Sequence, residues 1–572
     1  MRRFVGAAMP PNAPGSLPPV VCDLLIGYLL LQNAAHPGVT STQSPNSVSA
    51  NAAVPPAPTI PLPAEPQRFA APSTDGPDDN ELRHPSDGDW LSYNRDYFGQ
   101  RYSPLGSINT QNAAQLVPKC IFQTGEVGSF QASPVIRAGR LYITTVHHTY
   151  AIDAATCRRL WVHQYVPKSV GLDFLPTNRG IALYKGTVIR GTLDGHLIAL
   201  DSMTGTPVWD TWVADGAKGY FLSAAPVVFD GKVYLGEAGA DYGVSGHVHA
   251  FNAITGQPLW TFNVIPSDGE KGGDSWPKGS ERGGGSMWTT ISVDPATRRL
   301  YVSTGNPYLD FDGSQRAGSN LYTDSVVVLD ADTGRLKWYV QQNPHDVRDW
   351  DTAAAPVLYS AGGHQMMAVG SKDGRLYLYD RDNHTLLLHR DLVVRENDTG
   401  ALPPGKPTHV CPGTVGGVEW NGPAYDPANI LLFVNTDDWC VTITPQNHDD
   451  FIPSGGVPVF DPPEKAQGWL RAFDAATGAE RWHYHSNSPM LAGITPTAGG
   501  LVLTGTGSGE FLAFEARTGR QLYSFYTGGA LAAGVSTYLV GDRQFIAVAS
   551  GNSSRTLWQT SGGAMVIVFG LP

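Results

Sequence analysis

A few oxygen-bearing side chains lie in loops where their spacing would allow them to bind a metal ion. Asp241 lies in a glycine-rich loop at residues 236–246, and Asn306 follows a predicted strand. Asp349 and Asp351 are close together in the segment at residues 344–351. Carboxylate and amide oxygens that converge on one point are the ligands of a hard cation such as Ca²⁺. A single Asp in such a loop is more often a turn former, so this interpretation needs a fold that brings the loops together.

The elements that must position these loops come from an internal repeat. Each copy is an apolar strand, an Asp, two variable residues, Thr-Gly and then an aromatic residue, as in residues 199–209 and 250–260. An earlier copy at 151–161 has Cys157 in place of the Gly, and shorter matches begin at residues 328, 378, 472 and 513. The Asp and Thr-Gly predict a tight turn between two strands, because Gly adopts the positive φ that other residues resist.

Repeats of this length predict about four strands per unit, and such units stacked radially form a β-propeller. Seven copies, together with a last blade shared by residues 89–123 and 562–569, predict an all-β, eight-bladed propeller. The composition agrees, since 65 Gly, 44 Pro and 23 Tyr accompany only 16% charged residues. The net charge of -12 argues against a nucleic-acid partner, which would require a basic surface.

The N-terminal region predicts targeting rather than fold. Arg2 and Arg3 precede an apolar run at residues 24–31 and small residues at 33–35, so residues 1–35 are typical of a signal segment and predict an exported, periplasmic protein. A misassigned start codon or a retained membrane anchor are the alternatives. Residues 36–85 are rich in Pro, Ala, Ser and Thr and predict a disordered linker, which leaves 86–572 as the propeller. No later segment is long and apolar enough to span a bilayer, so we expect no transmembrane body.

Four cysteines lie in the predicted propeller, namely Cys120, Cys157, Cys411 and Cys440. An even number allows two disulfides in an exported protein, whereas free buried thiols are expected in the cytosol. The sequence has no CxxCH motif, which argues against a covalently attached c-type haem.

From Asp89 onward the chain resembles the quinoprotein alcohol dehydrogenases, the methanol and ethanol dehydrogenases that use pyrroloquinoline quinone. The resemblance rests on a series of short motifs that match in order and spacing across the chain. These motifs are Asp89-Trp-Leu-Ser-Tyr-Asn-Arg-Asp-Tyr97, Gln100-Arg-Tyr-Ser-Pro-Leu105, Ile108-Asn-Thr-Gln-Asn112, Gly283-Gly-Gly-Ser-Met-Trp288, Gly305-Asn-Pro307, Asn320-Leu-Tyr-Thr323 and Pro344-His-Asp346 followed by Asp349.

The resemblance implies a role for each matching residue. Asp241 and Asn306 correspond to metal ligands, and Asp349 corresponds to the catalytic base, which also contacts the metal. Trp288 corresponds to the indole under the quinone ring. The remaining cofactor contacts that the resemblance implies are Arg179, Ser223, Lys372 and, as a packing residue, Trp420. Cys411 and Cys440 have the spacing of a family disulfide, whereas a second disulfide between Cys120 and Cys157 stays open.

Several positions depart from the family pattern. Asp173-Phe174 replaces a pair of adjacent cysteines, and Phe174 could stack on the quinone instead. Gln131 stands where a Glu is common at the cofactor, Glu419 where an Asn is common, and Ser245 where an Arg is common. Asp351 is a further carboxylate that accompanies lanthanide binding in part of the family. Related sugar-oxidising members share it, so Ca²⁺ is the expected ion and a lanthanide is the alternative.

The function implied is hydride transfer from an alcohol, or from a hydrated aldehyde, to the quinone. Asp349 would take the hydroxyl proton, the metal would polarise the quinone carbonyl, and Lys372 would stabilise negative charge on its oxygens. Electrons would then pass to a separate acceptor, a cytochrome or a quinone. Two alternatives remain, a non-catalytic propeller scaffold of the cell envelope and a quinoprotein that acts on sugars or polymers.

Overall fold

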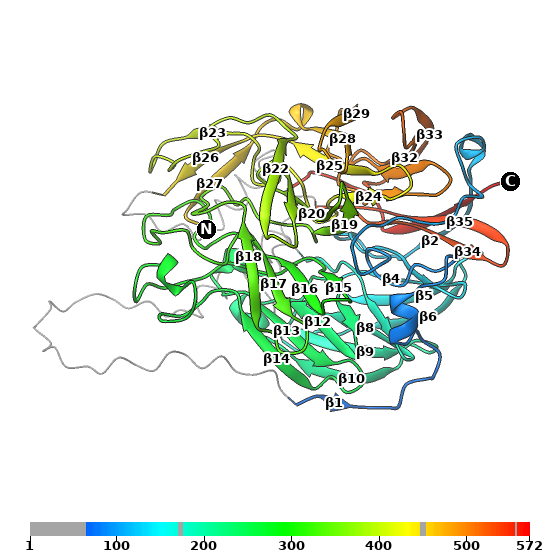
Figure 1. Cartoon of the computed structure of the whole chain (residues 1–572). Coiled ribbons are helices and arrows are strands. Elements are labelled where there is room, and N and C mark those ends of the chain that lie inside the picture. The colour runs from blue at the N-terminus through cyan, green and yellow to red at the C-terminus, as the bar shows by residue number, and fades with distance from the viewer. Residues whose placement is uncertain (1–64, 170–175, 447–453, 555–556) are drawn as a thin grey trace, which may run out of the picture. The chain divides into compact units, whose positions relative to one another are not determined.

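The computed structural model describes residues 65–169, 176–446, 454–554 and 557–572, and their regular secondary structure is almost entirely β-strand (Figure 1). From residue 65 on they belong to one compact unit. Short 3-10 turns interrupt the strands at Ala113–Gln115, Gly216–Lys218, Ala240–Tyr242, Gly273–Ser275 and Pro463–Lys465. Within this described part of the chain, no helix has the length and apolar character needed to cross a bilayer.

Seven stretches of the chain each form a four-stranded antiparallel sheet, which we call a blade. Blade 1 consists of β3 (Val135–Arg137), β4 (Arg140–Thr144), β5 (His148–Asp153) and β6 (Arg159–Gln164), and blade 2 of β7 (Ala182–Tyr184), β8 (Thr187–Gly191), β9 (His196–Asp201) and β10 (Pro207–Trp212). Blade 3 consists of β11 (Val227–Phe229), β12 (Lys232–Gly236), β13 (His247–Asn252) and β14 (Pro258–Asn263), and blade 4 of β15 (Ser292–Asp294), β16 (Arg299–Ser303), β17 (Ser325–Asp330) and β18 (Leu336–Gln341).

Blades 5 to 7 follow the same plan, with one insertion. Blade 5 consists of β19 (Val357–Ala361), β20 (His364–Ser371), β21 (Arg375–Asp380) and β22 (Thr385–Asp391). Blade 6 consists of β24 (Ala424–Asp426), β25 (Leu431–Asp438), β28 (Gln467–Asp474) and β29 (Glu480–Ser486). Blade 7 consists of β30 (Thr495–Pro496), β31 (Leu501–Gly505), β32 (Glu510–Glu515) and β33 (Gln521–Tyr526). Around blade 6 a separate three-stranded sheet is formed by β23 (Thr408–Val410), β26 (Val441–Pro445) and β27 (Gly456–Phe460).

The eighth blade is shared by two distant parts of the chain, as the sequence predicts. Strands β34 (Val535–Val540), β35 (Arg543–Ser550) and β36 (Met565–Gly570) are completed by β2 (Val117–Gln123). Strand β2 pairs antiparallel with β36, from Val117 opposite Gly570 to Gln123 opposite Met565. Cys120 on β2 is bonded to Cys157 in the turn between β5 and β6 of blade 1, which attaches the closing strand to the neighbouring blade. Cys157 has a φ of 58°, so it adopts the conformation that Gly adopts in the other copies of this turn.

Clusters of buried apolar side chains join each blade to the next. The cluster between blades 1 and 2 contains Tyr142, Trp161 and Ile198, and similar clusters join every following pair. The series is closed because Phe545 and Val568 of blade 8 share a cluster with residues of blade 1. The fold is therefore the closed eight-bladed propeller that the repeat predicts, and the inner strands form nearly continuous apolar runs because both of their faces are covered.

A tryptophan on the outer strand of one blade covers the Thr-Gly turn of the next blade. The Trp161 indole N–H donates to the carbonyl oxygen of Ser202 at 3.0 Å. A Cβ atom at Gly205 would lie 2.5 Å from the Trp161 ring, so the turn requires Gly for close approach as well as for its φ. The same relationship joins Trp209 to Gly256, Trp260 to Gly334 and Trp482 to Gly519.

Part of the segment that composition assigns to a disordered linker is ordered. Strand β1 (Gln67–Arg68) pairs with β10, and helix α3 (Asp79–Arg83) follows an Asp78 cap and buries Leu82. Composition misses this because backbone pairing and one apolar side chain suffice to fix the segment on blade 2. The predicted signal segment, and the predicted linker up to residue 64, lie outside the described residues.

Candidate active site

One cavity of about 540 Å³ lies where loops from several blades meet. Its wall contains every cofactor or metal residue predicted from the sequence that lies in the described ranges, namely Gln131, Arg179, Ser223, Asp241, Trp288, Asn306, Asp349, Asp351, Lys372 and Trp420. Phe174, predicted to stack on the cofactor, lies outside the described residues.

The strand order explains why residues so far apart in sequence reach one cavity. The first strand of a blade starts, and its second strand ends, at the same end of the sheet, because the two strands are antiparallel. The loops that lead into the first strands of five blades carry Gln131, Arg179, Ser223, Trp288 and Trp420, each three or four residues before the strand begins. These strands are β3, β7, β11, β15 and β24, respectively. Loops that follow β12, β16 and β20 supply Asp241, Asn306 and Lys372.

Lys372 joins two of the predicted metal-binding carboxylates. Its ammonium group donates to Oδ1 of Asp349 at 3.1 Å and to Oδ2 of Asp351 at 2.9 Å. The other carboxylate oxygen of Asp351 accepts the backbone N–H of Asn306 at 2.8 Å. Asp351 therefore connects the loop that follows β16 to the residue that follows β20.

Asp349 is presented to the cavity by a constrained loop. Its φ of 62° lies in the left-handed region, a conformation that non-glycine residues adopt mainly where the surroundings enforce it. The carboxylate of Asp346 accepts the backbone N–H groups of Arg348 and Trp350, which fixes the loop on both sides of Asp349. Burial raises the pKa of Asp349 well above its ordinary range, against the opposing effect of Lys372, and the charge of Asp351 adds to the rise.

A further carboxylate, Asp310, also faces the cavity and is absent from the sequence prediction. It accepts a hydrogen bond from the Asn306 amide nitrogen at 2.9 Å. That bond orients the amide and leaves its oxygen free to act as a metal ligand. Burial raises the pKa of Asp310 well above its ordinary value, and repulsion from Asp241 adds to the rise. The sequence does contain a signal for Asp310, because it follows Asn306 by four residues in the same loop.

Three tryptophans form an aromatic wall. The rings of Trp288 and Trp420 lie 6.4 Å apart, and those of Trp420 and Trp558 lie 5.3 Å apart in an edge-to-face contact. Trp420 is fixed by a 2.7 Å hydrogen bond from its indole N–H to the carbonyl oxygen of Ala532. Trp558 was not predicted, since it belongs to no repeat or family motif quoted above, and its indole N–H donates to Asp437 at 2.8 Å.

Arg179 is a buried cation at this aromatic wall. Its guanidinium lies 4.6 Å from the centre of the Trp288 ring and donates to the Trp288 carbonyl oxygen at 3.0 Å and to Oγ of Ser223 at 3.1 Å. Burial lowers its pKa to about 10, so it remains charged at neutral pH. Among the described residues no carboxylate lies within ion-pair distance of Arg179, and its Nε atom is buried without a hydrogen-bond partner.

These features fit both groups that the resemblance implies. Several carboxylates and an amide line the same cavity and form an oxygen-rich, negatively charged set of the kind that hard cations require, namely Asp241, Asp310, Asp349, Asp351 and Asn306. A planar, carboxylated quinone would find matching contacts in the unpartnered Nε of Arg179, the unpartnered amide oxygen of Gln131 and the face of Trp288.

Of the positions that depart from the family pattern, Gln131 and Glu419 line the cavity, whereas Ser245 does not. Gln131 donates from its amide nitrogen to the Ser553 carbonyl oxygen at 3.4 Å. Glu419 lines the cavity, and burial raises its pKa to about 8, against the lowering effect of Lys372. Ser245 donates instead to the carbonyl oxygen of Arg282 at 3.1 Å and is not part of the cavity wall.

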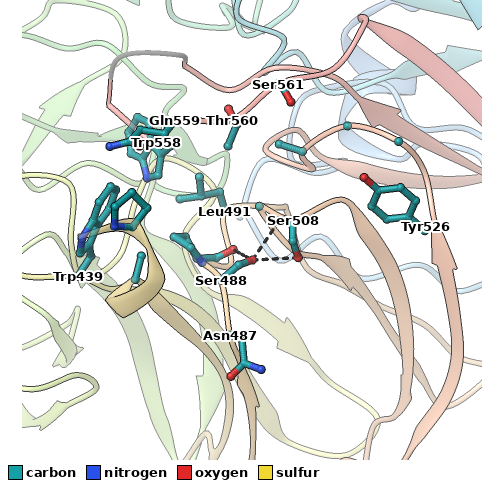
Figure 2. A pocket seen from close by; sticks show the side chains of 17 residues that line it. Trp439, Asn487, Ser488, Leu491, Ser508, Tyr526, Trp558, Gln559, Thr560 and Ser561 are labelled. Carbon is teal, nitrogen blue, oxygen red and sulfur yellow. Dashed lines mark hydrogen bonds between the residues drawn. The ribbon is translucent and has the colours of Figure 1, made fainter. Parts of the chain in front are cut away.

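A smaller cavity of about 270 Å³ shares Trp558 with the first one. Figure 2 shows Trp558 and Trp439 beside it, with hydroxyl groups of Ser488 and Ser508 joined by a hydrogen bond. Trp558 therefore forms part of the wall between the predicted site and this second cavity.

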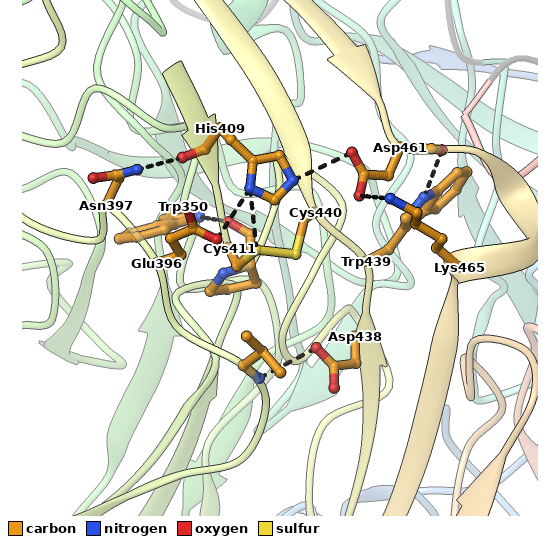
Figure 3. The surroundings of a disulfide bond; sticks show 12 residues. Trp350, Glu396, Asn397, His409, Cys411, Asp438, Trp439, Cys440, Asp461 and Lys465 are labelled. Carbon is orange, nitrogen blue, oxygen red and sulfur yellow. Dashed lines mark hydrogen bonds and ion pairs between the residues drawn. A yellow bond between two sulfur atoms is a disulfide. The ribbon is translucent and has the colours of Figure 1, made fainter.

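The predicted disulfide between Cys411 and Cys440 is present, with a Cα separation of 4.6 Å (Figure 3). It supports the base-bearing loop, because Pro412, which follows Cys411, accepts the Trp350 indole N–H at 3.3 Å. Trp350 stands between Asp349 and Asp351. The Cys120–Cys157 pair, which the sequence left open, is also bonded.

Comparisons with known proteins agree with this geometry. A family model described as glucose/ethanol/alcohol dehydrogenase, beta-propeller domain, matches residues 90–388, and a second, outer membrane protein assembly factor BamB, matches residues 466–566. The quinohemoprotein alcohol dehydrogenase of Comamonas testosteroni is 32% identical over 518 residues, which cover 81% of this chain and 72% of that protein. Quinoprotein alcohol dehydrogenase PedH of Pseudomonas putida is 31% identical over 502 residues, covering 79% and 84%.

A solved structure shows the same arrangement of the whole fold. The structure titled europium-containing methanol dehydrogenase matches with a TM-score of 0.78 at 26% identity, covering 86% of this chain and 100% of that one. The first family model spans the loops that carry Gln131, Asp349 and Lys372. The chain belongs to the family of pyrroloquinoline-quinone-dependent alcohol dehydrogenases.

Proposed function

We propose that this protein oxidises an alcohol to a carbonyl compound, with Asp349 as the catalytic base. The observation that carries the proposal is the contact of Asp349 with Lys372 at 3.1 Å, in a cavity that also presents Trp288 and the unpartnered guanidinium nitrogen of Arg179. A structural scaffold has no need for a buried ammonium group between two carboxylates at a cavity wall.

Both the quinone and the metal ion would be held by side chains that line the cavity. Trp288 and Trp420 would stack on or pack against pyrroloquinoline quinone, and Arg179 and Ser223 would bind its polar edge. Gln131 has an unpartnered amide oxygen for the same purpose, and Phe174 remains a proposed stacking residue. The proposed metal ligands are Asp241, Asn306, Asp349 and Asp351, with Asp310 orienting Asn306.

When bound, the quinone supplies the acceptor for a hydride and the cation supplies a Lewis acid that polarises it. Asp349 performs the matching proton transfer, because its carboxylate takes the hydroxyl proton as the carbinol hydride leaves with its electron pair. Lys372 donates hydrogen bonds from a buried position, which would stabilise negative charge that develops beside it. The alcohol thus loses one proton and one hydride and becomes an aldehyde or ketone.

The apolar residues in the cavity wall favour an alcohol with an apolar portion. Phe311, Val415, Phe460 and Leu557 contribute apolar side chains to its wall. Phe460 comes from the three-stranded sheet beside blade 6, so an insertion in the repeat contributes to the binding surface. A longer or aromatic alcohol would bury more apolar surface here than methanol would.

We further propose that the protein acts outside the cytosol and passes electrons to a separate acceptor, a cytochrome or a quinone. Two disulfides support export, because oxidising compartments are where structural disulfides persist. The sequence contains no CxxCH motif that would attach a haem to this chain.

The test is reconstitution of the full chain with the quinone and either Ca²⁺ or a lanthanide, followed by dye reduction over a panel of alcohols, aldehydes and sugars. Metal-dependent reduction with apolar primary or secondary alcohols is the expected result. Absence of quinone binding with either metal would contradict the proposal and favour the alternative of a non-catalytic propeller scaffold. A preference for sugars would keep the chemistry and replace the substrate class.

The metal itself is decided by maturation of the protein with both ions present. Five carboxylates line the cavity with the Lys372 ammonium group, and a trivalent cation neutralises them more fully than a divalent one; they are Asp241, Asp310, Asp349, Asp351 and Glu419. Metal analysis should therefore find the lanthanide in the purified enzyme, whereas exclusive Ca²⁺ occupancy would end the lanthanide interpretation.

A further inference from the structure

A second group of possible metal ligands lies in blade 3 and has no part in the mechanism above. His247 and His249 alternate on β13, so their side chains share one face of the sheet. Glu237 directly follows β12, whose last residue, Gly236, pairs with Val248. The pairing places the Glu237 carboxylate against the two imidazoles, on the same face.

The possible ligand atoms of these three side chains lie close to one another. Oε1 of Glu237 lies 2.6 Å from Nε2 of His249 and 3.3 Å from Nδ1 of His247. One ligand atom from each residue lies within 4.8 Å of the other two. Ligand atoms around tetrahedral Zn²⁺ are separated by about 3.3 Å, so changes in separation of about 1.5 Å or less would place the three ligands at three of the four tetrahedral positions.

Burial and one unpartnered nitrogen distinguish this group from a surface cluster. Glu237, His247 and His249 are 2%, 4% and 3% exposed. Nδ1 of His247 is buried without a hydrogen-bond partner, although it points to Glu237. A buried polar atom without a partner is costly, and a metal ion at this point would satisfy it.

His249 has the second interaction that metal-binding histidines normally show. Its other ring nitrogen, Nδ1, lies 2.9 Å from the hydroxyl of Thr261 on β14. Such a contact fixes the ring orientation and leaves Nε2 directed at the ligand group. Two imidazoles and one carboxylate are a donor set suited to Zn²⁺ and related divalent transition ions rather than to Ca²⁺.

We propose that Glu237, His247 and His249 bind a structural divalent transition-metal ion, with Zn²⁺ as the preferred ion. The ion would fasten the two segments that carry the predicted active site. The carbonyl oxygen of Glu237 accepts the backbone N–H of Met287, which precedes Trp288, and Oγ of Ser286 accepts the N–H of Ala240, which precedes Asp241. The site is buried, so the ion enters during folding and stays bound afterwards.

The test is metal analysis of the full chain, produced without a histidine tag in medium supplemented with Zn²⁺ and then loaded with the quinone and its hard cation. The expected content is about one equivalent of zinc per chain, retained after dialysis against a chelator. Growth with Co²⁺ instead should give visible absorption from cobalt bound to nitrogen and oxygen ligands. Wild-type protein that retains neither ion overturns the proposal.

Variants separate this site from the others. Glu237→Gln keeps the size and a hydrogen-bond acceptor while it removes the charge, and His249→Gln removes a ligand; both should reduce retained zinc at least tenfold. Asp241→Asn should change only the content of the hard cation. If a buried variant does not fold, the cobalt spectrum of the wild type still decides the question.

The chain provides a matched control in another blade. His483 and His485 also alternate on one strand, β29, with Glu480 beside His483 at 2.6 Å, but their group is exposed. His483→Gln should leave the retained zinc unchanged. Equal loss from His483→Gln and His249→Gln would identify non-specific binding to histidine and overturn the buried site.

Discussion

The ammonium nitrogen of Lys372 lies 2.9 Å from Oδ2 of Asp351, and both side chains are more than nine-tenths buried. A buried pair of this kind stabilises a fold only while both partners are present, because an unpaired charge inside a protein is costly. The pair is also located where the cation is proposed to bind, so its energetics depend on occupancy.

Replacement of Lys372 by Gln should therefore destabilise the metal-free protein by about 3–5 kcal/mol. The loss should be smaller with the cation bound, because the cation then neutralises Asp349 and Asp351. Denaturant unfolding with and without metal measures both values. Equal destabilisation in the two states would show that the cation does not bind next to this pair.

Asp349→Asn should reduce turnover by about 10²–10⁴-fold, because the amide cannot accept the alcohol proton. Asn tolerates the left-handed conformation of this position, so the fold and quinone binding should be retained. Dye reduction and quinone absorbance, measured on the same sample, separate the two effects. Near-normal turnover would remove Asp349 from the role of base.

The two disulfides should respond differently to removal. The loop between Cys120 and Cys157 spans 37 residues, and replacing both by Ser should lower the free energy of unfolding by about 3–4 kcal/mol with little change in turnover of the folded enzyme. Replacement of Cys411 and Cys440 should also lower kcat, since Pro412 contacts Trp350 beside the base. Thermal unfolding and steady-state kinetics on both double variants test this difference.

Asp201 should make the turn of blade 2 sensitive to acid. Burial alone would raise its pKa, but hydrogen bonds from the Ser73 backbone N–H and from Thr204 lower it below the ordinary value. A carboxyl with a depressed folded pKa contributes stability above its unfolded pKa of about 3.9, and this contribution disappears as the pH falls through the folded value.

Asp201→Asn should therefore cost about 1 kcal/mol at pH 7, and this cost should shrink as the pH falls below about 3.9 and through the folded pKa of Asp201. The substitution suits the turn, because Asn252 occupies the same position in blade 3 and accepts the same pair of backbone N–H groups. Unfolding curves of both proteins across this pH range give the difference. A constant difference at all pH values would assign the effect to the Asn side chain rather than to lost charge.

The sequence predicts the fold because the repeat combines local turn chemistry with long-range packing. Asp201, Gly205 and Trp161 belong to two different copies, yet each is visible as a motif, and the structure joins them in one contact. The order of residues 65–85 was not predictable from composition. It depends on pairing of β1 with β10 and on burial of Leu82, which involve partners far along the chain.

Site residues were predictable from the sequence where a recognisable motif surrounds them. They were less predictable where the fold, and not a motif, places them at the cavity. Asn306 and Asp349 stand in quoted motifs, whereas Asp310 and Trp558 join the cavity through loop geometry. The contact of Glu237 with His249 was equally hidden, since the sequence cannot show which face of β13 meets the end of β12.

The position of strand β2 has a consequence for the order of events during synthesis. Its strand partner β36 is made last, so both edges of β2 stay unpaired while more than 400 further residues are synthesised. Such an edge invites pairing with other chains. Cys120 and Cys157 are both made early, so their bond can tether β2 to blade 1 long before the ring closes. The disulfide thus acts as a safeguard during maturation, and its loss should lower the yield of active protein more than it lowers the activity of molecules that complete folding.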